Sequence, residues 1–355
     1  MEAEIQASDL LETCFRGQEW LDGLRKCHEP YRGYIMATAA FSFHDQHPQP
    51  ADFFQEVIDG LSHHPRHIPP KFFYDERGSQ LFDRICATPE YYPTRTEIAI
   101  LHDNAQAIAD RVGPDCLLIE PGSGNSVKVR ELLGSLVPRL YMPVDISKRY
   151  LRESARRLAA EYPWLEVRAA CADFTAGQGL PVLPDRGRRV IFFPGSSVGN
   201  FEPADLDNFL KVLAETVGAG GGLLIGIDLK KDPALLHAAY NDREGVTAAF
   251  NLNLLTRINR ELGADFDLAG FRHEAFYNPV LGRVEMHLVS LRDQTVGIDG
   301  HRFRFRRDES IHTESSYKYT VAEFSALART AGFSLDQVWM DAQEWFSVQY
   351  YRLTG

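Results

Sequence analysis

The sequence predicts an α/β fold with a parallel β-sheet core and a second, smaller α+β part. An apolar run at residues 117–119 ends at Glu120, turns on two glycines and continues with a helical pattern. Two further apolar stretches end at Asp145 and Asp173, each about one helix further along the chain. This alternation indicates parallel strands joined by helices. It breaks down at residues 232–276, where a polar-rich helical stretch indicates an insertion.

The glycine turn after the first strand predicts a ligand site. Gly122 and Gly124 allow a ligand to approach backbone N–H groups without meeting a Cβ. A dinucleotide fingerprint would need a third glycine where Val127 stands. Glu120 would repel a pyrophosphate but can accept hydrogen bonds from an ammonium group. The pattern therefore favours S-adenosylmethionine, and a tight turn without a ligand is the alternative for this motif taken alone.

The acids that follow the next strands extend this site. Asp145 comes 25 residues after Glu120, which suits a carboxylate that binds ribose hydroxyls. Asp173 could accept from an adenine amino group while Phe174 packs beside the ring. Singly, each acid would be read as a helix N-cap or a solvated turn. In series they predict one ligand trough, and residues 195–200 should face it from the next strand.

The composition excludes several kinds of partner. The net charge of −11 argues against nucleic acid, because phosphate binding relies on clustered Lys and Arg. Histidines at residues 63, 64 and 67 are interrupted by Pro65 and have no acid or cysteine at ligand spacing. They predict an exposed loop, so no metal is expected.

Cysteine usage and hydropathy indicate the compartment. The five cysteines are scattered, without a Cys-x-x-Cys pair, and Cys116 and Cys171 lie in strand-like runs. No apolar run approaches the roughly 18 to 20 residues of a membrane helix, and the N-terminus lacks the layout of a signal peptide. We expect a soluble cytoplasmic protein that acts as a monomer and does not contact membranes.

The remaining elements follow from local periodicity and from turn residues. Aromatic and charged residues at 69–79 and 89–95 predict a lid or wall of the trough, with an ordinary packed loop as an equal alternative. The other predicted elements, in chain order, are helix 51–58, strand 189–193, helix 203–217, strand 223–228, strand 283–290, strand 301–306, helix 321–331 and strand 337–340.

Several of these segments together resemble one enzyme family. The chain is similar, from Ile68 to Tyr351, to the S-adenosylmethionine-dependent histidine Nα-methyltransferases of ergothioneine biosynthesis. The segments that carry the resemblance are 73–79, 89–95, 120–124, 194–200, 239–242, 283–288 and 313–316. The loop at 195–200 and Ser315 differ conservatively from the commoner family wording.

The resemblance implies a fold and an activity. The fold is a Rossmann-like class I methyltransferase core with a smaller α+β substrate domain formed by the N-terminal segment and an insertion. The implied reaction transfers methyl groups from S-adenosylmethionine to the α-amino group of L-histidine, three times, to give the betaine hercynine. We accordingly divide the chain into an N-terminal extension (1–50), a substrate-binding domain (51–100 and 232–310) and a methyltransferase core (101–231 and 311–355).

The resemblance also implies the site residues. Those that hold the cofactor are Tyr74, Gly122, Lys128, Asp145, Asp173 and Phe174. Those that hold the substrate are Asn200 and Tyr240 at its carboxylate, and Tyr91, Glu314, Ser316 and Met286 around its imidazole. No catalytic base is assigned. The alternatives are an Nα-methyltransferase for tryptophan or tyrosine and a non-catalytic S-adenosylmethionine-binding regulator, while a nicotinamide dehydrogenase is disfavoured because the third glycine is missing.

Overall fold

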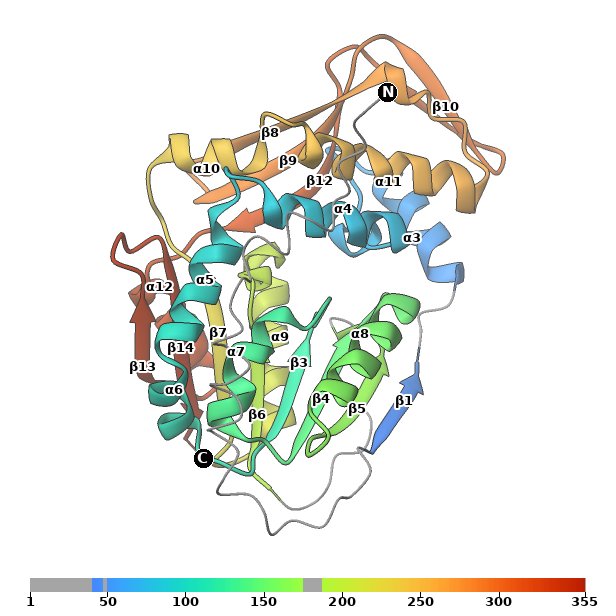
Figure 1. The fold of residues 1–355 in the computed structure, drawn as a ribbon. Helices are drawn as coiled ribbons and strands as arrows, with labels where there is room; N and C mark the ends of the chain where they lie inside the picture. The colour runs from blue at the N-terminus through green and yellow to red at the C-terminus, as the bar shows by residue number, and fades with distance from the viewer. Residues whose placement is uncertain (1–39, 47–49, 175–186, 355) are drawn as a thin grey trace, which may run out of the picture. The chain divides into compact units, whose positions relative to one another are not determined.

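A large β-sheet forms the centre of the computed structural model, which describes residues 40–46, 50–174 and 187–354. Its strands, in chain order, are β1 (Phe41–Asp45), β3 (Leu117–Pro121), β4 (Leu140–Asp145), β5 (Glu166–Cys171), β6 (Arg189–Phe193), β7 (Gly222–Asp228), β13 (Phe333–Met340) and β14 (Phe346–Leu353). In space the order is β1-β5-β4-β3-β6-β7-β14-β13 (Figure 1). The strands from β1 to β7 run parallel, and β14 runs antiparallel to both of its neighbours.

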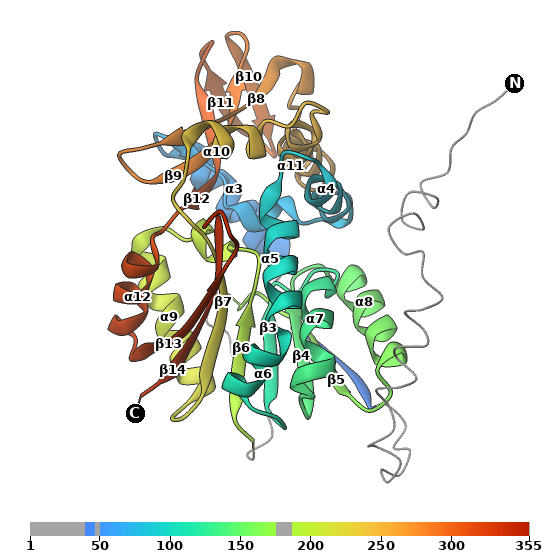
Figure 2. The same cartoon turned by 60° about the vertical axis from the view of Figure 1, so that its left-hand side comes forward.

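Helices cover both faces of this sheet (Figures 1 and 2). One face packs against α5 (Tyr92–Asp103), α6 (Ala105–Val112), α7 (Val127–Leu136) and α8 (Lys148–Glu161). The other face packs against α9 (Pro203–Val217) and α12 (Val321–Thr330). Strands that are covered on both sides read as continuous apolar runs, which is why β3 and β7 were visible in the sequence. This arrangement confirms the predicted Rossmann-like α/β core.

A second, smaller region lies over the carboxyl ends of the parallel strands (Figure 1). Its sheet has the order β2-β12-β9-β8 and is joined by a separate hairpin, β10-β11. The strands are β2 (Arg66–His67), β8 (Phe271–Asn278), β9 (Arg283–Ser290), β10 (Gln294–Ile298), β11 (His301–Phe305) and β12 (Ser310–Tyr317). The helices are α3 (Pro50–Ser62), α4 (Glu76–Ala87), α10 (Pro233–Tyr240) and α11 (Val246–Leu262), with short 3-10 turns η2 (Pro70–Phe73) and η5 (Leu268–Gly270). A further 3-10 turn, η4 (Ser197–Asn200), follows β6 of the large sheet. This region has its own apolar core.

A β-bulge in β12 decides which side chains face this core. The register against β9 shifts between His312 and Glu314. His312 is opposite His287, while Glu314 is opposite Met286, and partners in an antiparallel pair point to the same face. The bulge therefore directs Glu314 inward, toward the buried side of the small sheet, and leaves His312 on the outer side.

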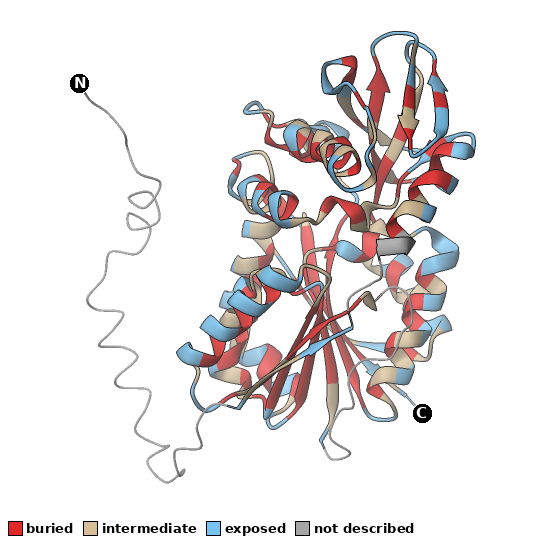
Figure 3. Ribbon diagram, turned by 90° about the vertical axis from the view of Figure 1, so that its right-hand side faces the viewer, coloured by how far each residue is buried: buried red, intermediate tan, exposed pale blue. Residues whose placement is uncertain are grey.

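Several strands lie where the sequence analysis predicted none, namely β1, β2, β8, β10, β12 and β14. Strand β14 was missed because its buried positions include Ser347 and Gln349, which are polar but hydrogen-bond to one another at 2.8 Å. Strand β8 fell inside the stretch predicted to be helical, because its outward positions are polar. Figure 3 shows the buried strands and the exposed outer helix faces.

The sheets also bear on the predicted division of the chain. Strand β1 lies within the predicted N-terminal extension, yet it forms the edge of the large sheet beside β5. Strand β12 follows residue 310, where we placed the core, yet it pairs with β9 in the small sheet. The exact domain boundaries stay a prediction, and residues 1–39 and 47–49 of the extension lie outside the described residues. Among the described helices, none has the length and apolarity that crossing a membrane requires.

Candidate functional site

A polar cavity, whose empty space of about 380 Å³ is partly open to solvent, lies where the small region meets the carboxyl ends of the parallel strands. Six of the predicted site residues line it: Tyr74, Tyr91, Asn200, Tyr240, Glu314 and Ser316. The predicted loop contributes Gly195, Ser196 and Ser197 as well. Pro93, from the segment 89–95 that was predicted as a lid or wall, also lines the cavity. Three residues for which the sequence analysis predicted no role in the site complete the wall: Phe82, Asp228 and Lys318.

The lining comes from segments that are far apart in the sequence. Tyr74 immediately follows η2, and Tyr91 immediately precedes α5. Asn200 ends η4, which follows the core strand β6, and Tyr240 ends α10. The rings of Tyr91 and Tyr240 meet edge to face with centroids 6.3 Å apart. The cavity thus needs both regions of the molecule, and each supplies a different wall.

Glu314 is the acid of this cavity and has few partners. It is 8% exposed, and its one hydrogen bond among the described residues comes from Asn200 Nδ2 at 3.4 Å. Burial raises the pKa of Glu314 to about 7, although the charge of Lys318 opposes that shift. A carboxylate in this state gains from any ligand that donates a hydrogen bond to it.

A hydrogen-bonded network lies beside Glu314. The Tyr240 hydroxyl donates to Ser316 Oγ at 2.8 Å, and Lys318 Nζ donates to both oxygens. Lys318 is also paired with the buried Asp228 at 2.7 Å. Asp228 ends strand β7, so the rule that found acids at the ends of β4 and β5 could have found it too. Lys318 carries no such sequence signal, because it follows a strand that was not predicted.

Met286 is the one predicted substrate residue that does not line the cavity. It lies opposite Glu314 in the β9-β12 pair, is 2% exposed and packs within the apolar core of the small region. Its side chain therefore supports the strand that carries Glu314.

The predicted cofactor residues gather at the carboxyl edge of the large sheet. Asp145 accepts from the backbone N–H of Gly124 at 3.0 Å and from that of Ser147 at 2.9 Å. Ser147 in turn donates through its hydroxyl to the backbone oxygen of Tyr74 at 3.0 Å. Because the Tyr74 side chain lines the cavity, this chain of contacts joins the glycine turn to the polar pocket.

Asp173 and Phe174 lie at the same edge. Asp173 Oδ2 forms an ion pair with Lys71 Nζ at 3.3 Å. A Cβ placed on Gly122 would lie 3.6 Å from the Phe174 ring, an ordinary contact distance, so this ring packs beside the turn. Gly122 also has φ +67°, a conformation that glycine adopts without strain.

Lys128 connects the two groups of residues in a different way. Its Nζ lies 2.7 Å from Glu97 Oε2, and Glu97 is completely buried. Glu97 also accepts from the backbone N–H of Gly195, which lines the cavity. Lys128 thus forms an ion pair with a protein carboxylate. The pair lies between the polar cavity and the carboxyl edge of the large sheet where the predicted cofactor residues gather, which we call the cofactor edge.

Two expectations about the glycine turn are corrected by the structure. The N–H groups of Gly122 and Ser123 donate to Val144 O at 2.7 Å and 3.2 Å, so they do not point toward an open edge. Glu120 is 2% exposed and hydrogen-bonds to the Tyr141 hydroxyl. Burial raises the pKa of Glu120 to about 8, so it suits a neutral, internally bonded acid better than a partner for a ligand's ammonium.

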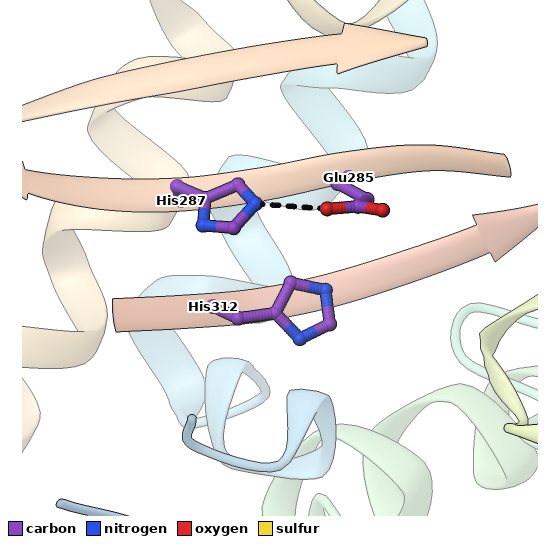
Figure 4. Close-up of side chains that lie close together, drawn as sticks. All are labelled: Glu285, His287 and His312. Carbon is purple, nitrogen blue, oxygen red and sulfur yellow. Dashed lines mark hydrogen bonds and ion pairs between the residues drawn. The ribbon is translucent and has the colours of Figure 1, made fainter. Parts of the chain in front are cut away.

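A separate cluster lies on the outer face of the small sheet (Figure 4). Potential ligand atoms of Glu285, His287 and His312 lie within 4.8 Å of one another. Glu285 is already bonded to His287 at 3.2 Å, to Arg283 at 2.9 Å and to Asn278 at 3.0 Å. The Arg283 guanidinium neutralises the carboxylate and would oppose a dication. We therefore interpret this cluster as a polar network that stabilises the outer face.

Comparisons with known proteins agree with this geometry. The family described as "Histidine-specific methyltransferase, SAM-dependent" matches residues 53–353. The histidine N-alpha-methyltransferase of Mycolicibacterium smegmatis is 42% identical, over 81% of this chain and 90% of that protein. The protein of the same name from Mycobacterium tuberculosis is 40% identical over the same shares. The 4-dimethylallyltryptophan N-methyltransferase of Aspergillus fumigatus is 28% identical, over 80% of this chain and 88% of that protein. The chain belongs to the family of histidine-specific, S-adenosylmethionine-dependent methyltransferases.

Proposed function

We propose that this protein transfers methyl groups from S-adenosylmethionine to the α-amino nitrogen of L-histidine. The observation that carries the proposal is the buried carboxylate of Glu314, which has one long hydrogen bond among the described residues and lines a polar cavity. The imidazole of histidine offers an N–H donor of the kind that this carboxylate lacks. The two mycobacterial relatives, at 40% and 42% identity, support the same substrate.

The carboxyl edge of the large sheet fits the cofactor. Ser123 Oγ, within the glycine turn, is buried and has no hydrogen-bond partner among the described residues, as expected where a polar ligand group completes the site. We propose that Gly122, Asp145, Asp173 and Phe174 hold the cofactor, with Tyr74 and Lys128 toward the pocket. When bound, the cofactor supplies a methyl group that its sulfonium has already activated.

The residues of the cavity act by positioning. A nitrogen must present a free lone pair to the methyl carbon, and orientation in a closed site supplies much of the rate of such a transfer. We propose that Asn200 holds the substrate carboxylate, while Tyr91, Glu314 and Ser316 hold the ring. The resemblance places Tyr240 at the carboxylate as well, but its one hydroxyl proton goes to Ser316 Oγ, so we propose that Tyr240 supports the ring-binding side. The α-amino group is mostly protonated at neutral pH. We assign no side chain as a base and propose that solvent takes this proton.

The aromatic wall suits a product that becomes a fixed cation. Phe82, Tyr74 and Tyr91 lie together, with centroid distances of 5.7 Å and 6.3 Å from the Phe82 ring to the two tyrosines. Ring faces attract a quaternary ammonium. We therefore propose three successive methylations, which give the trimethyl betaine hercynine.

Mass spectrometry of histidine after incubation with enzyme and S-adenosylmethionine tests the substrate and the number of methyls together. A gain of three methyl groups on the α-nitrogen is expected. Parallel reactions with tryptophan and tyrosine serve as controls, because the 28% identical relative is named for a tryptophan derivative. Faster methylation of tryptophan or tyrosine than of histidine would show that histidine is not the preferred substrate.

A further inference from the structure

Lys318 is buried next to the cavity and uses all of its protons. Its side chain is 1% exposed. The Nζ atom lies 2.7 Å from Asp228 Oδ2, 3.0 Å from the Tyr240 hydroxyl and 2.9 Å from Ser316 Oγ. An ammonium group has three donors and no acceptor, so these three contacts occupy it completely.

The direction of the neighbouring hydrogen bonds follows from this. Because Lys318 can only donate, the hydroxyl oxygens of Tyr240 and Ser316 must both accept from it. The Tyr240 hydroxyl then donates its own proton to Ser316 Oγ at 2.8 Å. Ser316 Oγ thus accepts two hydrogen bonds, which fill both of its lone pairs, and its own proton needs a further acceptor. The described residues offer none, and Ser316 lines the cavity, so this proton is available to a ligand.

A buried aspartate holds Lys318 in its charged form. Asp228 is 1% exposed and also accepts from the Tyr92 hydroxyl at 2.7 Å and from Lys231. Burial alone would lower the pKa of Lys318, but Asp228 raises it above its ordinary value. The ammonium therefore keeps its three protons at neutral pH, and the direction of the hydroxyl bonds is fixed.

We propose that Lys318 is a positioning residue that makes Ser316 a hydrogen-bond donor toward the substrate ring. This inference rests on the proposed function. A neutral imidazole has one N–H and one acceptor nitrogen. Glu314 accepts the N–H, while Ser316 donates to the second nitrogen. Glu314 and Ser316 are two residues apart on β12 and both line the cavity, so they bracket one ring.

This arrangement of one acceptor and one donor also favours binding of histidine over tryptophan. An indole has a single N–H and no acceptor nitrogen. It could satisfy Glu314 but would leave the buried Ser316 proton without a partner, which costs free energy. The preference then depends on Lys318, which does not itself need to touch the substrate.

Calorimetric titration with L-histidine, in the presence of S-adenosylhomocysteine, tests the inference on Lys318→Met. Methionine keeps the length of the side chain and removes the three donors. The Kd of histidine should rise about 10- to 100-fold, as expected when a bond to a buried group is lost. Lys231→Met is the matched control, because Lys231 also pairs with Asp228 but contacts neither Tyr240 nor Ser316. Its histidine Kd should stay within about 3-fold of wild type; an equal rise in both variants would mean that charge alone matters and would overturn the inference.

A double-mutant cycle separates positioning from a general structural role. In a Ser316→Ala background, Lys318→Met should change the histidine Kd by less than about 3-fold, since the proton it directs is gone. Full additivity of the two substitutions would overturn the inference. The affinity for S-adenosylhomocysteine checks folding in each variant. If Lys318→Met does not fold, Ser316→Ala alone should reduce the preference for histidine over tryptophan about tenfold, and an unchanged preference would contradict the assignment.

The result is distinguishable from a failure of the proposed function. If wild-type protein binds no histidine, the proposed function fails before any variant is compared. If wild-type protein binds histidine and Lys318→Met binds it equally well, only the role of Lys318 is wrong.

Discussion

The two halves of the site use their carboxylates differently. At the cofactor edge, Asp145 accepts from two backbone N–H groups, at 3.0 Å and 2.9 Å, that lie within its own turn and the turn beside it. In the polar cavity, Glu314 has, among the residues that the structure describes, one hydrogen bond at 3.4 Å, which comes from a side chain 114 residues away in sequence. Asp145 is held by the fold, whereas Glu314 can still accept further hydrogen bonds. The difference predicts that changes at Asp145 act through a preformed turn, while changes at Glu314 act directly on substrate binding.

The largest effect is expected from Glu314→Ala, which tests the substrate half. Histidine turnover, measured as kcat/KM, should fall about 100- to 1,000-fold, because the ring N–H loses its buried acceptor. Binding of S-adenosylhomocysteine should stay close to wild type, since Glu314 does not contact the residues of the glycine turn. Unchanged histidine kinetics would show that Glu314 does not bind the substrate. The proposed difference between Asp145 and Glu314 would then be wrong.

The next effect concerns Lys128, which joins the halves. Lys128→Met should lower the free energy of unfolding by about 3 kcal/mol, because it strands the buried Glu97 carboxylate. Denaturant unfolding measures this loss. Lys211→Met is a suitable control: its 2.6 Å pair with Asp207 is exposed, so about 0.5 kcal/mol or less is expected. Equal losses of unfolding free energy in the two variants would show that the Lys128–Glu97 ion pair does not stabilise the contact between the cofactor edge and the cavity.

The contrast between the halves also explains what the sequence could predict. The cofactor edge is built from short local patterns, in which an apolar run, an acid and a turn follow one another, and β3, β4 and β5 were found from them. The cavity joins Tyr91, Asn200, Tyr240 and Glu314 from four distant segments. No local sequence pattern predicts that these four segments come together, so the roles of these residues were predicted from the family resemblance alone. Neither the local patterns nor the family resemblance predicted a role for Lys318, because that role depends on hydrogen-bond directions that only three-dimensional contacts define.

Glu120 tests whether the cofactor edge is held by neutral, internally bonded groups. Burial raises the pKa of Glu120 to about 8, against an ordinary value of 4.5. The folded protein then binds more protons than the unfolded chain between these values, so this group's contribution to stability is full below pH 4.5 and is lost as the pH rises through 8.

Glu120→Gln keeps an acceptor for Tyr141 and removes this titration. Its stability should match wild type near pH 5 and exceed it by about 3 kcal/mol at pH 8, measured by denaturant unfolding. A difference between the two proteins that does not change with pH would mean that Glu120 is charged in the folded state, and that it is free to meet a ligand's ammonium after all.

The smallest effect is expected at Asp145, where the turn is preformed. Each carboxylate oxygen of Asp145 accepts from one backbone N–H, and Asp145→Asn exchanges one of these oxygens for an amide donor. Either Gly124 N–H or Ser147 N–H then loses its acceptor while the other keeps it. The affinity for S-adenosylhomocysteine should fall about tenfold, and calorimetry in the absence of histidine isolates that step. Asp232→Asn, which changes an exposed acid that also accepts from a backbone N–H, is the control and should leave cofactor affinity unaltered. A fall in cofactor affinity of Asp145→Asn as large as the fall in histidine turnover of Glu314→Ala would mean that both carboxylates contact ligands to the same extent. The proposed difference between a turn held by the fold and a pocket completed by the substrate would then be wrong.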